Sequence, residues 1–176
     1  AASDLLTRDG GTEALRRYFE PYVQTARASG VGIVLETATW RASPDWASRL
    51  GHSTAELAEL NRRAVRLLEG LRADYETETT PIVISGCVGP RGDGYVVGAA
   101  MTADEAEAYH SEQIGTFAGS AADLVTAITM TYVDEAVGIV RGARAAGLPV
   151  VISFTVETDG RLPSGQSLRE AIEEVD

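Results

Sequence analysis

The chain has 176 residues and a formal net charge of −11, and all 15 of its basic residues are arginines. Because lysine is absent, Schiff-base chemistry and a P-loop lysine are excluded. Hydrophobic residues at 44% and charged residues at 23% are typical of a globular protein, and we treat residues 1–176 as a single domain. The acidic balance, with no basic cluster, argues against nucleic-acid binding.

The sequence also bears on compartment and membrane association. One cysteine, Cys87, excludes a disulfide within the chain and a zinc site built from several of its own cysteines. No run approaches the roughly 18 apolar residues that a membrane-spanning helix needs. We therefore expect a cytoplasmic protein that does not insert into membranes.

Helical and strand patterns alternate from the start of the chain. Apolar residues at helical spacing predict a first helix from Gly11 to Ser29, and Asp9-Gly10-Gly11 is interpreted as the turn that starts it. A buried strand is expected at Val31–Leu35. A long helix is then expected from Ser53 or Thr54 to about Ala73.

The same alternation continues to the end of the chain. Gly89–Gly98 predicts a glycine-rich loop, and Thr102-Ala-Asp-Glu105 has the spacing of a capping box that starts a helix. The other expected elements are strands at 81–86, 123–128 and 149–154, a helix at 134–146 ended by Gly147, and a helix from about residue 164.

Four short apolar strands, each followed by a helix, predict right-handed crossovers and a parallel sheet. Doubly wound sheets and βα barrels both begin in this way. No Gly-x-Gly-x-x-Gly follows the first strand, which argues against a dinucleotide site. Polar residues instead follow each strand, as on the active face of a TIM barrel, which has eight strands in about 250 residues. The predicted fold is therefore α/β, a partial TIM (βα)8 barrel with four strands present.

Several segments, taken in order, resemble the homocysteine S-methyltransferase family. These segments are Phe19–Tyr22, Gly30–Ser43, Ile84–Asp93, Tyr109–Gln113, Ala122–Leu124 with Glu135-Ala136, Leu148–Phe154 and Gly160–Leu168. The resemblance covers nearly the whole chain, and its specificity lies in the ordered set of motifs. It implies a TIM barrel, of which this chain corresponds to strands two to five.

The resemblance implies an enzyme of methionine biosynthesis that passes a methyl group to the thiol of homocysteine. In the family, a zinc ion bound by three cysteines activates that thiol by lowering its pKa. The family places these cysteines in an Asn-Cys motif after the sixth strand and a Gly-Gly-Cys-Cys motif after the eighth. Neither motif is present here. We expect zinc, a thiol and a methyl donor for the intact family member, and no catalysis from this chain alone.

Candidate substrate-binding residues follow the first and third predicted strands. They are Glu36, Thr37, Thr39, Trp40 and Thr129. At the mouth of a barrel, Glu36 would orient a substrate amine or an arginine, and Trp40 would line the pocket. The structural alternatives are a surface ion pair for Glu36, simple packing for Trp40 and helix capping for Thr129. No residue is assigned as catalytic or as a metal ligand.

One position departs from the family pattern in a way that concerns the substrate. The resemblance implies a Glu-Thr after the family's fourth strand, whose Glu binds the amino group of homocysteine. Here the pair reads Ile128-Thr129. An apolar side chain cannot pair with an ammonium group, so the identity of the acceptor thiol is left open.

The glycine-rich loop is interpreted as a support for the mouth of the barrel. Gly89, Pro90 and Asp93 are the residues expected to shape it, and Arg91 is expected to form a local salt bridge with Asp93. A contact of its backbone amides with a carboxylate is the alternative.

Three further polar side chains are interpreted as structural. Cys87 lacks neighbouring cysteine or histidine ligands and is expected to be a buried small residue. His110 and Gln113 fall in the middle of a predicted helix and are expected to pack or to form hydrogen bonds.

Two other functions are kept open. The first is a non-catalytic α/β binding or assembly module, whose two free sheet edges would favour a homo-oligomer. The second is a barrel enzyme that uses another metal or carboxylate chemistry through Glu36, Asp93 and Glu157.

Overall fold

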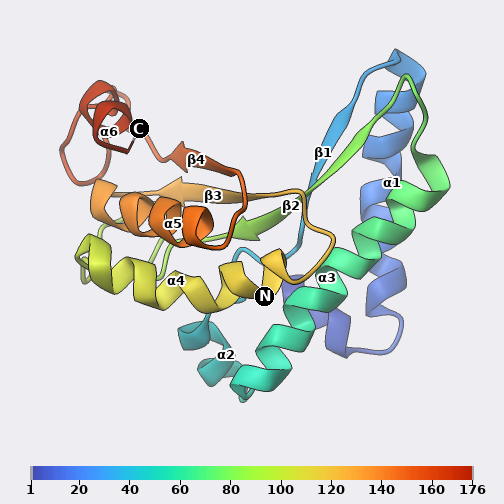
Figure 1. The fold of residues 1–176 in the computed structure, drawn as a ribbon, viewed down its shortest axis with the longest axis horizontal. Helices are drawn as coiled ribbons and strands as arrows, with labels where there is room; N and C mark the ends of the chain where they lie inside the picture. The colour runs from blue at the N-terminus through green and yellow to red at the C-terminus, as the bar shows by residue number, and fades with distance from the viewer. Residues whose placement is uncertain (1, 176) are drawn as a thin grey trace.

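The structure, a computed structural model, describes residues 2–175 and contains four strands with intervening helices (Figure 1). In chain order the elements are the 3-10 helix η1 (Ala2–Thr7), α1 (Gly11–Ser29), β1 (Ile33–Glu36), α2 (Pro44–Leu50), α3 (Thr54–Tyr75), β2 (Ile82–Val88), α4 (Ala103–Ala118), β3 (Leu124–Met130), α5 (Val133–Ala145), β4 (Val150–Phe154) and α6 (Leu168–Val175).

Most predicted elements are confirmed, with shifts at their ends. Gly10 is left-handed at φ 71° and α1 begins at Gly11, which confirms the predicted turn. Strand β1 begins at Ile33 rather than at residue 31, β3 extends to Met130, and α6 begins at Leu168. The short helices η1 and α2 have no predicted counterpart, because neither is long enough to show a helical apolar period.

The sheet order separates the two α/β architectures that the sequence left open. All neighbouring pairs are parallel, and the strands lie in the order β1-β2-β3-β4. A doubly wound sheet reverses its strand order at a switch point, whereas successive strands of a βα barrel lie side by side. The observed order is that of part of a barrel.

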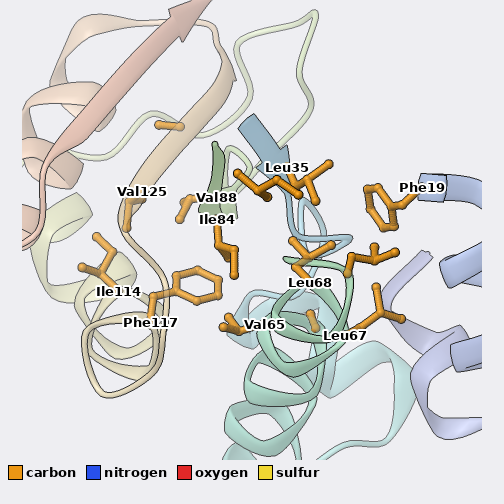
Figure 2. Packing of buried hydrophobic residues seen from close by; sticks show 14 of the residues in the cluster. Phe19, Leu35, Val65, Leu67, Leu68, Ile84, Val88, Ile114, Phe117 and Val125 are labelled. Carbon is orange, nitrogen blue, oxygen red and sulfur yellow. The ribbon is translucent and has the colours of Figure 1, made fainter. Parts of the chain in front are cut away.

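The helix-facing side of the sheet carries the core. Ile84 and Val125, on adjacent strands, are buried in one cluster with Leu68 of α3 and with Ile114 and Phe117 of α4 (Figure 2). Helices α4 and α5 pack closely against each other (Figure 1). Among residues 2–175, no helix is long and apolar enough to span a membrane.

The opposite side of the sheet carries polar side chains and partly exposed apolar ones. Glu36, Ser85 and Thr126 lie on it, and the Ser85 and Thr126 hydroxyls are 2.7 Å apart. Val34 and Val151 on this side are 52% and 50% exposed. In a closed barrel this side faces the interior, which combines polar and apolar side chains.

Close packing of β2 on α4 depends on a residue without a side chain. A Cβ atom at Gly86 would lie 2.5 Å from Cδ2 of Phe117, closer than any ordinary contact. Phe117 is fully buried and its ring packs against the sheet (Figure 2). Gly86 therefore sets how near α4 approaches the sheet.

We expect Gly86→Ala to destabilise the fold by about 1–3 kcal/mol, because Phe117 must move within a close-packed core. The matched control is Gly115→Ala in α4, where a Cβ atom meets nothing within 4 Å. That change should stabilise the helix by roughly 0.5–1 kcal/mol. Urea unfolding of both variants measures the difference, and equal effects would contradict the packing argument.

Candidate functional site

The ends of β1 and β3 meet through the side chain of Trp40. Its indole Nε1–H donates to the Ile128 carbonyl at 3.2 Å and to the Thr129 hydroxyl at 3.1 Å. Trp40 follows the carboxyl end of β1, so it crosses the end of β2 to reach β3. The structure thus brings together two of the predicted site residues, Trp40 and Thr129, from positions 89 residues apart in sequence.

Thr129 has a strained backbone at this point. Its φ of 61° lies in the left-handed region, which a β-branched residue rarely adopts. A shift in register from Ala127 to Met130 forms a β-bulge that contains Ile128 and Thr129. Such strain costs on the order of 1–3 kcal/mol and concentrates at functional sites.

The loop between β2 and α4, residues 89–102, covers this edge of the sheet. A Cβ atom at Gly94 would lie 2.8 Å from the Thr129 hydroxyl and 3.0 Å from the Trp40 ring. The Gly94 carbonyl accepts a hydrogen bond from the Thr155 hydroxyl at 2.5 Å, just after β4. Strand β3 and the segments that follow β1 and β4 therefore all contribute residues that contact this loop.

Thr37 and Thr39 form a buried link between β1 and β2. The Thr37 hydroxyl accepts from the Cys87 amide at 2.8 Å, and the Thr39 hydroxyl donates to the Cys87 carbonyl at 2.7 Å. The two hydroxyls lie 2.6 Å apart. Since the Thr39 proton goes to the carbonyl, Thr37 is the donor between them. Both hydroxyl protons are used within the protein, and substrate contact by these residues stays a prediction.

Glu36 lies on the inner side of the sheet beside the Ser85 and Thr126 hydroxyls. Its Oε2 atom is buried and has no hydrogen-bond partner. Burial raises the pKa of this carboxyl group, and the two hydroxyls oppose the shift only in part. The expected alternative, a surface ion pair, is absent from the salt bridges of residues 2–175.

The described residues do not fit a zinc site. Cys87 is buried, as predicted, and burial raises the pKa of its thiol, with the Glu36 charge a second cause. A cysteine that binds zinc does so as a thiolate, the form that a raised pKa disfavours. Within residues 2–175, no three histidine, cysteine, aspartate or glutamate side chains come together as a metal site. In that range, no metal site is therefore formed by the carboxylates of the alternative metal chemistry, Glu36, Asp93 and Glu157.

The structure places the loop residues beside Trp40 and α2, and it corrects one expected contact; a supporting role stays a prediction. Gly89 packs against the Trp40 backbone, where a Cβ atom would lie 2.1 Å from its carbonyl oxygen, and Pro90 is buried. The predicted salt bridge between Arg91 and Asp93 is wrong. Arg91 Nε donates instead to Asp45 of α2 at 2.9 Å, because the loop runs beside that helix. Asp93 accepts from the backbone amide two residues ahead, as in an Asx turn.

Buried polar side chains on the helices form hydrogen bonds around the site segments, as expected for His110 and Gln113. Gln113 Nε2 donates to the Thr39 carbonyl at 3.3 Å and to Asn61 Oδ1 at 3.0 Å. His110 Nε2 lies 2.9 Å from Glu135 Oε1. Sequence reasoning assigned no role to Asn61 or Glu135. Each is a polar residue at an apolar position of its helix, and that irregularity is the signal by which they could have been found.

A groove of about 440 Å³ adjoins this edge. It lies between the loop after β2 and the segment after β4, and its lining includes Tyr95, Val96, Glu157, Asp159 and Arg161. Glu157 is exposed there and is separate from the contacts around Trp40.

Comparisons with known proteins point to one family. A family profile described as homocysteine S-methyltransferase matches residues 2–176, nearly the whole chain. No functionally curated protein matches.

The fold resembles solved structures of the homocysteine methyltransferase MmuM from Escherichia coli. The oxidised form aligns with a TM-score of 0.85 at 20% identity, covering 99% of this chain and 61% of that one. The metallated form aligns with a TM-score of 0.82 at 20% identity, covering 99% and 62%. This chain thus spans about three-fifths of MmuM, and its four parallel strands match part of that fold. Together with the family profile, this shows that the chain belongs to the homocysteine S-methyltransferase family.

Proposed function

We propose that this chain forms part of the substrate-binding wall of an enzyme that passes a methyl group to a thiol such as homocysteine, giving methionine. The observation that carries the proposal is the family match over residues 2–176. The cluster of Trp40, Thr129 and Gly94 supports it, because βα-barrel enzymes bind substrates at the carboxyl ends of their strands.

In this proposal the residues of the chain bind and orient substrate and do not activate the thiol. Trp40 and Thr129 line the pocket at the junction of β1 and β3. Glu36, with its unpartnered Oε2, contributes a carboxyl group that can bond to a polar substrate atom from the inner side of the sheet. The resident metal of the family finds no ligands among these residues, so the chain by itself is proposed to be inert.

Methyl transfer to homocysteine is the direct test of the proposed function. We expect the complete protein to convert homocysteine to methionine with a sulfonium or a quaternary ammonium donor, while residues 1–176 alone show no turnover. Methionine formation is measured by mass spectrometry with an isotopically labelled donor. Failure of the complete protein with every thiol and donor class would overturn the proposal.

Ile128 offers a test of substrate choice. In the complete protein, we expect Ile128→Glu to lower the KM for homocysteine by about tenfold, because a carboxylate then faces the ammonium group. The KM for 4-mercaptobutyrate, which lacks the amino group, should not fall. An equal change for both thiols would show that position 128 does not face the amine.

The raised pKa of Glu36 predicts a pH dependence of stability. A folded-state pKa above the unfolded value makes ionisation unfavourable for folding, so the stabilisation present below about pH 4 is lost as the pH rises through the folded pKa. Glu36→Gln does not ionise and should gain stability relative to the wild type as the pH rises towards 7. Urea unfolding across that range measures this, with exposed Glu78→Gln as the control. A parallel pH profile in all three proteins would contradict it.

A further inference from the structure

The loop over the candidate site, residues 89–102, is attached to the start of α5 at both ends. The Arg91 amide donates to Oε1 of Glu135 at 2.7 Å, near the beginning of the loop. The Met101 amide donates to the Tyr132 hydroxyl at 3.0 Å, near its end. Tyr132 is the N-cap residue of α5, and Glu135 lies in its first turn. One helix terminus therefore holds the loop both where it leaves β2 and where it enters α4.

Glu135 is a buried carboxylate with few but well-defined partners. It is 1% exposed, and its Oε1 atom receives both the Arg91 amide and His110 Nε2, which lies at 2.9 Å. His110 is also 1% exposed, and its Nδ1 atom is buried without a partner. The tautomer with its proton on Nε2 leaves no buried donor unpaired, so His110 donates to Glu135.

The Glu135 carboxyl group lies where two hydrogen-bond donors and the N-terminus of α5 converge. The N-terminus of α5 carries a partial positive charge, and the carboxylate accepts two hydrogen bonds. Burial raises the pKa of the Tyr132 phenol to about 12, and the Glu135 charge adds to that shift. The phenol therefore stays protonated and neutral beside the carboxylate.

The hydrogen bonds of Glu135 are not needed merely to hold α4 and α5 together. The two helices already approach closely at Gly138, where a Cβ atom would lie 2.5 Å from the Ala106 Cβ. An exposed ion pair, Asp104 with Arg141 at 2.8 Å, also joins them. What Glu135 adds is a bond to the backbone of the loop, which belongs to neither helix.

We propose that Glu135 is a positioning residue, which with His110 fixes Arg91 and so places the loop against Trp40 and Thr129. The proposal rests on the proposed function only in treating this edge as the substrate site. The attachment of the loop is independent of that assignment.

Amide hydrogen exchange, measured by NMR on this chain, tests the attachment without any activity. We expect Glu135→Ala to speed exchange of the Arg91 amide by about tenfold more than that of core amides, since its acceptor is lost. Glu135→Gln retains a carbonyl acceptor and should show a smaller increase. The control Asp104→Asn, which removes the charge from another contact between α4 and α5, should leave the Arg91 amide unchanged.

A second measurement tests whether loss of the bond between Glu135 and the loop changes the surroundings of Trp40. In a Trp46→Phe background, Trp40 is the remaining tryptophan, and its ring lies against Gly94 of the loop. We expect Glu135→Ala to increase the quenching of Trp40 fluorescence by acrylamide, and Asp104→Asn to have no effect. A purely structural pair would not alter the Trp40 signal selectively.

The possible outcomes separate the two proposals. Uniform acceleration of all amides, or unchanged exchange at Arg91 with unchanged quenching of Trp40, would overturn the positioning role. If Glu135→Ala does not fold, Arg91 exchange and Trp40 quenching are compared between Glu135→Gln and Asp104→Asn, and the same outcomes support or overturn the positioning role. Selective exchange at Arg91 in a protein whose complete form transfers no methyl group would leave the attachment standing and overturn the proposed function.

Discussion

The structure depends first on the consecutive parallel pairing of its four strands. Because every crossover leads to the adjacent strand, the carboxyl ends of β1 to β4 lie along one edge. The segments that follow them are then close enough to interact. Trp40 after β1 reaches Thr129 in β3, and Thr155 after β4 reaches Gly94 in the loop after β2.

A second feature is that buried polar side chains on the helices form hydrogen bonds to the site segments. Gln113 and Asn61 hold the segment after β1, and Glu135 with His110 holds the loop after β2. These groups lie on helices, whose backbones are rigid, while the segments that they hold have irregular structure. Hydrogen bonds from a rigid scaffold restrict loop positions at a modest cost, because every buried donor that takes part has an acceptor.

Strain and packing at the edge act together. Ile128 and Thr129 lie where the register of β3 shifts, and the Trp40 indole donates to the carbonyl of the first and the hydroxyl of the second. Gly94 can approach only because it has no side chain. The family match is the basis on which we propose a substrate-binding role for this arrangement.

The sequence by itself determined the α/β class, the alternation of elements and the family, since apolar periodicity and ordered motifs are local properties. It also placed candidate residues such as Glu36 and Trp40 at strand ends. Only the tertiary structure decided their partners: Thr37 and Thr39 bond to Cys87, Arg91 pairs with Asp45 and not Asp93, and Glu135 holds a loop 44 residues away. The physical reason is that these hydrogen bonds join segments distant in sequence. Their existence depends on sheet order and helix packing, which no local pattern contains.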